Sequence, residues 1–196
     1  MNTLLRLFLL LPFFSIPLLA SDNEPPAGFL ALFNGKDLSG WKENRQDPVH
    51  WSVKEGELVY DGRGSHLFHE KEFGNFILLV DWKVPNNGNS GVFLRGGATQ
   101  VEINDADKAP REVWNGTSGG LYPHLPPTKR AAKPADEWNH YEIRVEKGIV
   151  TVFLNGERTV DAFAMKWGNR EKGAIGFQHH GTALAVKNIY IKALED

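Results

Sequence analysis

Pairs of turn-forming residues divide most of this 196-residue chain into short runs, and this spacing limits the fold more than any other feature. Glu55-Gly56, Lys147-Gly148 and Asn155-Gly156 each stand between runs that are rich in β-branched and aromatic residues. Apolar and polar residues alternate within these runs, which is the period of a half-buried strand. No stretch longer than a turn or two has the 3.6-residue period of a helix. The sequence therefore predicts an all-β domain, either a sandwich or a closed β architecture.

The predicted strands are interrupted once, by a long segment. Two strands are expected within 50–62, one over 73–84, a hairpin over 89–105, two around a Lys-Gly turn in 140–160, and two more in 172–194. Residues 104–138 have little strand pattern, and a connection of this length is uncommon in a compact domain. Its tryptophan, leucine and tyrosine residues favour an ordered, functional loop that packs over the sandwich.

The first twenty residues have the pattern of a secretory signal peptide. Arg6 precedes an apolar run that reaches Leu19, and the small Ala20 marks a cleavage point. We expect residues 1–20 to be removed; an uncleaved N-terminal anchor is the alternative. Residues 21–28 are polar and proline-rich and would form a tether. The protein would then be exported to the periplasm, the cell surface or the medium, as one domain over residues 29–196 without a membrane span.

Charge and cysteine content exclude several classes of protein. Without Arg6, 21 basic residues stand against 24 acidic ones, so the mature chain has a net charge of about −3. This argues against nucleic acid as a partner, because phosphate contacts need a positive surface. The chain has no cysteine, which excludes thiol catalysis and thiolate metal sites. Composition leaves the oligomeric state open.

The predicted hairpin NSGVFLRGGATQVEIND, residues 89–105, carries a row of polar side chains. Successive side chains of a strand point to opposite faces, so Gln100, Glu102 and Asn104 share one face. If the two strands pair, Arg95 also lies near Glu102. Two interpretations follow: a solvated cross-strand ion pair worth at most about 1 kcal/mol, or one wall of a binding site.

Histidines and tryptophans supply further candidates. The histidines near strand ends or in the long loop are His66, His69, His124 and His179. No HExxH motif occurs and no histidine pair has obvious metal-ligand spacing, so a metal site would need histidines and carboxylates from distant strands. No GxSxG elbow supports a serine hydrolase. Aromatic faces stack on sugar rings, and Trp114 and Trp167, which lie outside the strand pattern, are the better ligand candidates.

Several motifs occur together in a characteristic order. ALFNGKDLSGW, GNSGVFLRG, AAKPADEWNHYEIRV, VTVFLNGERTV and GAIGFQHHGTALAVKNIYIK follow one another along the chain. In this combination the sequence, over residues 29–193, resembles the 3-keto-disaccharide hydrolase domain family. The resemblance implies a concanavalin-A-like jelly-roll β-sandwich of two curved antiparallel sheets, with a ligand site on the concave face. It also implies a substrate class, glycosides whose C3 hydroxyl has been oxidised to a ketone.

The chemistry implied by the resemblance assigns roles to some of these residues. A C3 ketone acidifies the C2 proton, so a base can form an enolate and the C1 leaving group can depart before water adds. Glu102 or a histidine would be the base, and Arg95, Lys133 or a bound divalent cation would stabilise the enolate. His124, on the long loop, would be the acid. The substrate-binding candidates are Gln100, Asn104, Asp105, Trp114, Lys133, Gln178 and His179.

One departure from the family pattern bears on the base. Many members read YEVQILD where this chain reads TQVEIND, so the usual acid falls on Gln100 and the usual amide on Glu102. The polar face is kept, but its acid has moved by two positions. The function expected from the sequence is an exported enzyme that cleaves 3-keto-glycosides by hydrolysis or elimination. The alternatives are a carbohydrate-binding domain without catalytic activity and an adhesion or scaffold domain.

Overall fold

The computed structural model describes residues 22–43, 50–97, 99–106 and 112–195. The expected signal peptide, residues 1–20, lies outside this set. The described residues form strands and turns but no helix, and so include no helix that could cross a membrane.

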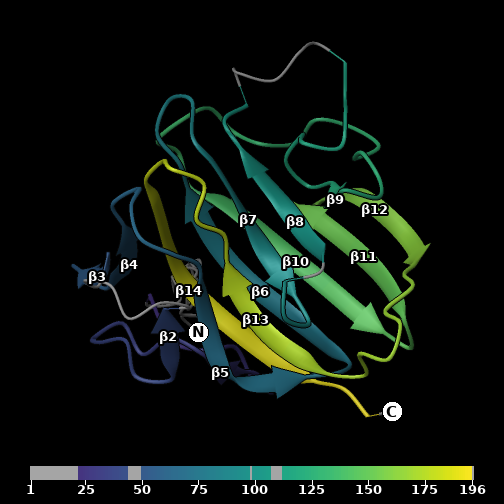
Figure 1. Cartoon of the computed structure of the whole chain (residues 1–196), viewed down its shortest axis with the longest axis horizontal. Coiled ribbons are helices and arrows are strands. Elements are labelled where there is room, and N and C mark those ends of the chain that lie inside the picture. The colour runs from purple at the N-terminus through teal and green to yellow at the C-terminus, as the bar shows by residue number, and fades with distance from the viewer. Residues whose placement is uncertain (1–21, 44–49, 98, 107–111, 196) are drawn as a thin grey trace, which may run out of the picture.

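The strands form two antiparallel sheets that pack face to face, with β7, β8 and β13 in front of β6, β10 and β14 in Figure 1. The larger sheet has the order β12 (Glu157–Ala164), β11 (Ile149–Leu154), β10 (Asn139–Glu146), β6 (Phe76–Lys83), β14 (Leu184–Ala193), β4 (Glu57–Tyr60), β3 (Trp51–Lys54), and β1 (Leu30–Ala31) also pairs with β14. The smaller sheet has the order β2 (Trp41–Glu43), β5 (Leu67–Phe73), β13 (Gly173–Phe177), β7 (Asn89–Leu94), β8 (Thr99–Asn104), β9 (Leu121–Tyr122). The predicted all-β sandwich is confirmed.

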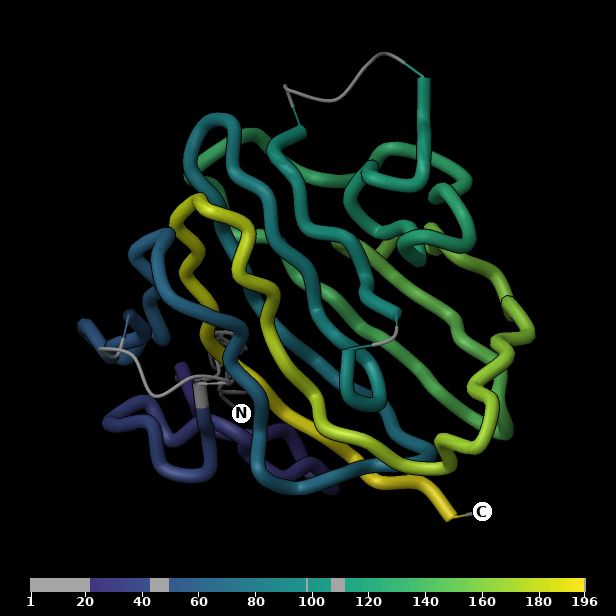
Figure 2. The backbone as a smooth tube through the Cα atoms, viewed as in Figure 1, coloured from purple at the N-terminus to yellow at the C-terminus, as the bar shows by residue number. Residues whose placement is uncertain are grey.

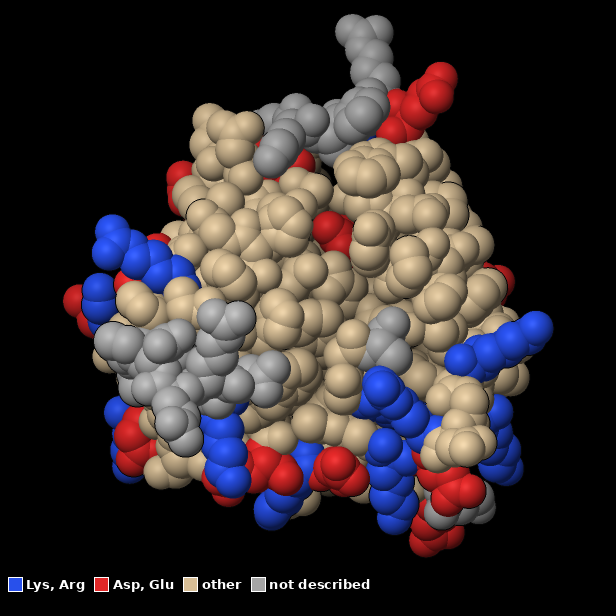
Figure 3. Space-filling model, in the orientation of Figure 1, with Lys and Arg blue, Asp and Glu red and all other residues tan. Residues whose placement is uncertain are grey.

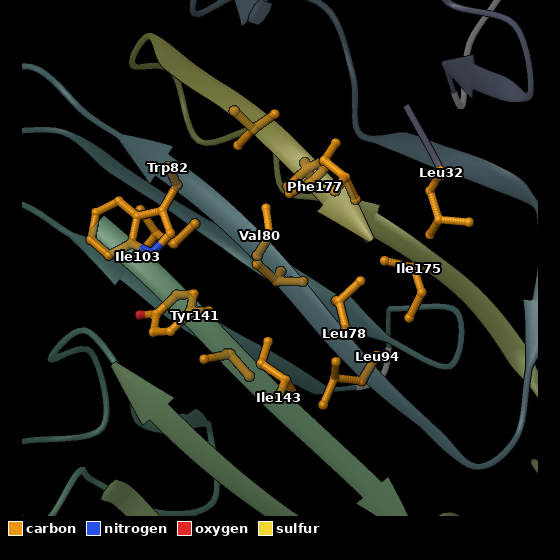
Figure 4. Close-up of a cluster of buried hydrophobic side chains, with 14 of the residues drawn as sticks. Leu32, Leu78, Val80, Trp82, Leu94, Ile103, Tyr141, Ile143, Ile175 and Phe177 are labelled. Atoms are coloured by element: carbon orange, nitrogen blue, oxygen red, sulfur yellow. The ribbon is translucent and has the colours of Figure 1, made fainter. Parts of the chain in front are cut away.

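Alternation along the strands builds the core between the sheets. Along β6, Phe76, Leu78, Val80 and Trp82 are buried while the residues between them are partly exposed. Figure 4 shows side chains of both sheets meeting in this space, among them Trp82, Tyr141, Ile103 and Phe177. Burial of each large side chain stabilises the fold by roughly 1.5–3 kcal/mol. The core thus fixes which side chains of the smaller sheet remain on its outer surface.

The predicted turns are hairpin turns in the structure. Glu55, Lys147 and Asn155 have positive φ angles of 52°, 48° and 53°, and each is followed by a glycine with positive φ. Two consecutive residues in this conformation match the right-handed twist of the strands on either side. These turns join β3 to β4, β10 to β11, and β11 to β12.

Two segments are more tightly held than their composition suggests. Asp22 and Asn23, expected in the tether, bind β14: Asp22 forms an ion pair with Lys187 at 2.7 Å, and the Asn23 amide donates to Asn188 at 2.7 Å. The predicted long loop contains the short strand β9, which pairs with β8. Figure 2 traces the later part of this loop as a folded coil beside β8 and β12. The described part of the loop therefore widens the smaller sheet.

Candidate active site

The outer face of the smaller sheet, which points away from the larger sheet, carries the candidate site. Val92, Val101 and Phe177 point into the core and have no exposed surface. Their neighbours along β7, β8 and β13 must therefore point outward. Figure 3 looks onto this face: its middle is mostly uncharged, with acidic atoms visible in a hollow, and lysine and arginine atoms gather at the lower rim.

One row of residues crosses this outer face from β5 to β8, and we call it the first row: His66, Gln178, Gly91 and Glu102. Gly91 lies opposite Glu102 in the pairing of β7 with β8. The backbone N–H of Gln178 donates to the Gly91 carbonyl at 2.9 Å, which extends the pairing of β13 with β7 by one residue. His66 precedes Leu67, the partner of Phe177, so it lies beside Gln178. Three strand spacings of about 4.8 Å put about 14 Å between the Cα atoms of His66 and Glu102.

A second row runs parallel to the first and is largely aromatic; it consists of Phe68, Gly176, Phe93, Gln100 and Tyr122. The rings of Phe68 and Phe93 are stacked with centroids 5.4 Å apart. Gly176 makes this possible, because a Cβ there would lie 2.4 Å from Phe68 Cδ1. Tyr122 is 44% exposed at the opposite end of the row. The second row thus offers apolar surface on both sides of Gln100.

Glu102 is a buried acid held by amides. Glu102 is only 3% exposed, and Gln100 Nε2 donates a hydrogen bond to its Oε2 at 2.9 Å. The same Gln100 nitrogen lies 3.2 Å from Gln178 Oε1, which ties β8 to β13. Burial raises the pKa of Glu102 from 4.5 to about 8, and the hydrogen bond from Gln100 only partly offsets that rise. At neutral pH the group is therefore mostly a neutral acid with high proton affinity.

The backbone around Glu102 is fixed on both sides. Its amide donates to the Gly120 carbonyl at 3.0 Å, and the Gly119 amide donates back to its carbonyl at 3.1 Å. The same carbonyl accepts the hydroxyl of Tyr141, which reaches across from the larger sheet. These bonds hold the backbone of Glu102 rigidly in position, as a catalytic group requires.

The end of β8 is tied to the long loop and to the turn before β7. Asn104 donates through Nδ2 to the Gly116 carbonyl at 3.1 Å, and Asp105 accepts from the Asn87 amide at 2.7 Å. Trp114, predicted as a sugar-stacking residue, is 46% exposed, and its ring covers Gly116. A cavity of about 210 Å³ opens beside Asn104, Asp105, Ser118 and Arg130.

Arg95 lies apart from Glu102. β7 ends at Leu94, and Arg95 takes a φ of 48°, so the alternation that would align it with Glu102 stops one residue earlier. Its guanidinium donates to the Gly74 carbonyl at 2.8 and 3.1 Å and to the Arg170 carbonyl at 3.1 Å, and it stacks over Trp167 at 4.6 Å. Four residues of strand, about 13 Å, separate it from Gly91. Arg95 and Trp167 therefore pack against each other at the far end of the sheet, where they hold neighbouring loops together.

His124 also lies away from the first row. Its Nε2 is 3.2 Å from Thr99 Oγ1, and its ring stacks on Phe163 of β12, with 6.5 Å between the centroids. Thr99 alternates with Val101 and faces the side of the larger sheet. His124 is therefore at the edge of the sandwich rather than over Glu102.

Lys133 and His179 also point elsewhere. Lys133 Nζ donates to the Trp138 carbonyl at 3.0 Å, near the start of β10 in the larger sheet. The His179 ring turns inward, where its Nδ1 meets the hydroxyl of Tyr60. The backbone amide of His179, however, donates to His66 Nδ1 at 2.8 Å. His179 thus takes part in the site by holding His66.

No metal centre is evident in the part of the chain that the structure describes. No three His, Asp or Glu residues there lie close enough together to bind one ion. The amides of Gln100 and Gln178 lie beside Glu102 on the outer face, and His66 lies at the other end of the first row.

Sequence reasoning found Glu102, Gln100 and Gln178 but missed His66 as a partner of the hairpin, together with Phe68, Phe93 and Tyr122. The outward positions of Phe93 and Phe68 could have been read from their apolar neighbours Val92 and Leu67. Their proximity could not, because β13, from the C-terminal part of the chain, lies between β5 and β7.

Gly91 provides a test of this geometry. A Cβ at this position would lie 2.7 Å from Gln100 Cδ, so Gly91→Ala should push the Gln100 amide out of its place beside Glu102. We expect kcat/KM on the substrate proposed below to fall about 100-fold, the scale expected when a catalytic group is displaced by about 1 Å. Thermal unfolding of the variant supplies the control for folding. Unchanged kcat/KM would show that the hollow is not the site.

Known proteins resemble this chain over most of its length. A family model described as "3-keto-alpha-glucoside-1,2-lyase-like domain" matches residues 28–192. A curated protein of Bacteroides thetaiotaomicron named 3-keto-disaccharide hydrolase is 27% identical over 229 aligned positions, which cover 86% of this chain and 79% of the relative.

Solved structures show the same architecture. A candidate glycosyl hydrolase from Parabacteroides distasonis aligns with a TM-score of 0.77 at 28% identity, covering 89% of this chain and 100% of that one. A laminarinase from Flavobacterium sp. UMI-01 aligns with a TM-score of 0.54 at 14% identity, covering 85% and 98%. At that identity the likeness shows the fold alone. The predicted concanavalin-A-like jelly roll of two curved antiparallel sheets is confirmed.

Proposed function

The chain belongs to the 3-keto-alpha-glucoside-1,2-lyase-like domain family, and on that premise we propose that it cleaves 3-keto-glycosides with Glu102 as the general base. The observation that carries the proposal is a buried acid of high proton affinity on an aromatic-flanked sheet face. The relative named 3-keto-disaccharide hydrolase supports the substrate class. A sugar ring seated on the first row, above the amides of Gln100 and Gln178, would have Glu102 on one side and His66 on the other.

The proposed reaction begins with proton transfer from C2 of the sugar to the Glu102 carboxylate. The C–H electron pair becomes the C2=C3 double bond, and the carbonyl pair moves to O3, which gives an enolate. When the C3 carbonyl re-forms, the C2=C3 electron pair becomes a C1=C2 double bond, and the C1–O bond breaks with its electron pair leaving on the aglycone oxygen. In this proposal, protonated Glu102 returns its proton to that oxygen. Water then adds to C1 of the resulting enone and a proton returns to C2, which completes a net hydrolysis.

The environment of Glu102 suits a base for this step. A carbon acid is weakly acidic, so a carboxylate of raised proton affinity removes its proton more readily than one with the usual pKa of 4.5. Gln100 orients the carboxylate through Oε2. Among the described residues no hydrogen bond reaches Oε1, which leaves it for the substrate.

The proposal includes export. The apolar segment from Leu7 to Leu19 has the length and flanking residues of a signal peptide. A net charge close to neutrality suits an uncharged sugar as ligand.

A direct assay separates the enzyme from a carbohydrate-binding domain. The purified protein is incubated with a 3-keto-glucoside, with and without a chelator, and release of the aglycone is followed. The wild type should consume the substrate. A protein that binds the 3-keto-glucoside without consuming it would instead be a binding domain, with Trp114 and Tyr122 as its exposed stacking residues.

The pH dependence of kcat/KM tests the role of Glu102. Because the base must be ionised in the free enzyme and its pKa is about 8, kcat/KM should rise about tenfold per pH unit up to pH 8 and then level off. A profile that falls through pH 8 would mean that Glu102 must be protonated, and a flat profile from pH 6 to 9 would remove it from the mechanism.

A further inference from the structure

His66 occupies a distinct place on the outer face of the smaller sheet. Its ring packs edge-on against Phe93, with 4.9 Å between the centroids and 74° between the planes. Phe93 is the β7 partner of Gln100, and Gln100 holds Glu102. His66 and Glu102 therefore flank the same stretch of sheet, with Gln178 and the Gln100 amide, which lies over Gly91, between them.

The tautomer of His66 is fixed by the backbone. The His179 amide donates to Nδ1 at 2.8 Å, so Nδ1 must be the acceptor and a neutral ring must carry its proton on Nε2. The His179 ring is in turn anchored at the hydroxyl of Tyr60 in the core. Within the described part of the chain Nε2 has no hydrogen-bond partner. The ring thus presents one oriented N–H donor.

His66 is also kept neutral. Burial lowers its pKa from 6.5, and positive charge on His179 would lower it further. A neutral imidazole is a suitable electrophile for an enolate, because its N–H stabilises developing negative charge without requiring a prior protonation.

We propose that His66 is a further catalytic residue, whose Nε2–H donates a hydrogen bond to O3 of the 3-keto sugar and stabilises the enolate oxygen that forms there. This rests on the proposed function. As Glu102 takes the C2 proton, the electron pair of the C3 carbonyl moves to O3, where the Nε2–H is held. The charge is released when the carbonyl re-forms and the aglycone departs. His66 keeps its proton throughout.

Two substitutions separate the donor role from a structural role. In His66→Asn, Oδ1 stands near the position of Nδ1 and keeps the bond from the His179 amide, but the Nε2–H donor is lost. In His66→Gln, the side-chain Nε2 stands near the ring Nε2 and keeps a donor, but the bond to His179 is lost. A merely structural role would make the asparagine variant the more active of the two.

The measurement uses two substrates. Turnover of a 3-keto-glucoside reports the whole reaction. Exchange of the C2 proton of a 1-deoxy-3-keto-glucose with D₂O, followed by NMR, reports enolate formation alone, because this compound has no leaving group. We expect His66→Asn to lose roughly 100- to 1000-fold in both, as on removal of one oxyanion donor, and His66→Gln to stay within about tenfold of the wild type.

Three results would overturn the inference. Wild-type rates in His66→Asn would leave the proposed function intact and give His66 a structural role. Loss of turnover with normal exchange would assign His66 to the leaving group instead of the enolate. A wild type inactive in both assays would remove the proposed function, and the role of His66 with it.

Discussion

Replacing Glu102 with glutamine is expected to lower turnover of a 3-keto-glucoside by about 100- to 10,000-fold, the usual contribution of a general base. The substitution keeps the shape of the side chain and an oxygen that can accept from Gln100. It removes only the ability to take a proton. A Glu102→Gln variant that retained wild-type turnover would exclude Glu102 from the reaction.

The same substitution is expected to stabilise the protein at high pH. The pKa of Glu102 is raised in the fold from 4.5 to about 8, so between these values the folded protein holds a proton that the unfolded chain has released. The stability provided by the neutral acid is present below pH 4.5 and is lost as the pH rises toward 8. A pKa difference of this size corresponds to several kcal/mol, on the order of 3 to 5 once local relaxation is allowed for.

Urea denaturation of both proteins at pH 5 and pH 9 measures this effect. The free energies of unfolding should be similar at pH 5 and should favour the glutamine variant at pH 9. Other titrating groups are shared by the two proteins, so their contributions cancel in the difference. Equal stabilities at pH 9 would mean that Glu102 ionises without strain and is not the high-affinity base proposed here.

Replacing Arg95 with alanine is expected to cost stability rather than activity. The side chain is 6% exposed and donates three hydrogen bonds to the carbonyls of Gly74 and Arg170. Hydrogen bonds from a charged donor contribute about 1.5–3 kcal/mol each, and the carbonyls left behind would be unsatisfied. We expect a loss of about 3 to 5 kcal/mol in the free energy of unfolding, with kcat of the folded fraction within about threefold of the wild type.

Arg95→Lys is the matched control. Lysine keeps the charge and the alkyl stem but lacks the planar fork that contacts two carbonyls, so an intermediate loss of stability is expected. If Arg95→Ala kept wild-type stability and lost turnover by 100-fold or more, Arg95 would belong to the chemistry after all. The sequence motif alone favoured that outcome, and the left-handed backbone at Arg95 is the reason for the reversal.

The local sequence determined the strands and the hairpins of this protein. Alternation along 89–105 predicted that Gln100, Glu102 and Asn104 share a face, and all three lie on the outer face of the smaller sheet. Turn pairs such as Asn155-Gly156 predicted reversals that the structure contains. These features were predictable because side-chain alternation and turn conformation depend on residues a few positions apart.

The tertiary structure alone decided which polar groups meet. His66 precedes β5 and Glu102 lies in β8, and they share a row only because β13, about 70 residues further along the chain than β8, pairs between β5 and β7. His124, on the long loop, lies away from this row because its ring packs on Phe163 of β12. Arg95 lies away from it because its positive φ ends the strand alternation. Strand order depends on how whole strands bury their apolar faces against the other sheet, and no short stretch of sequence encodes it.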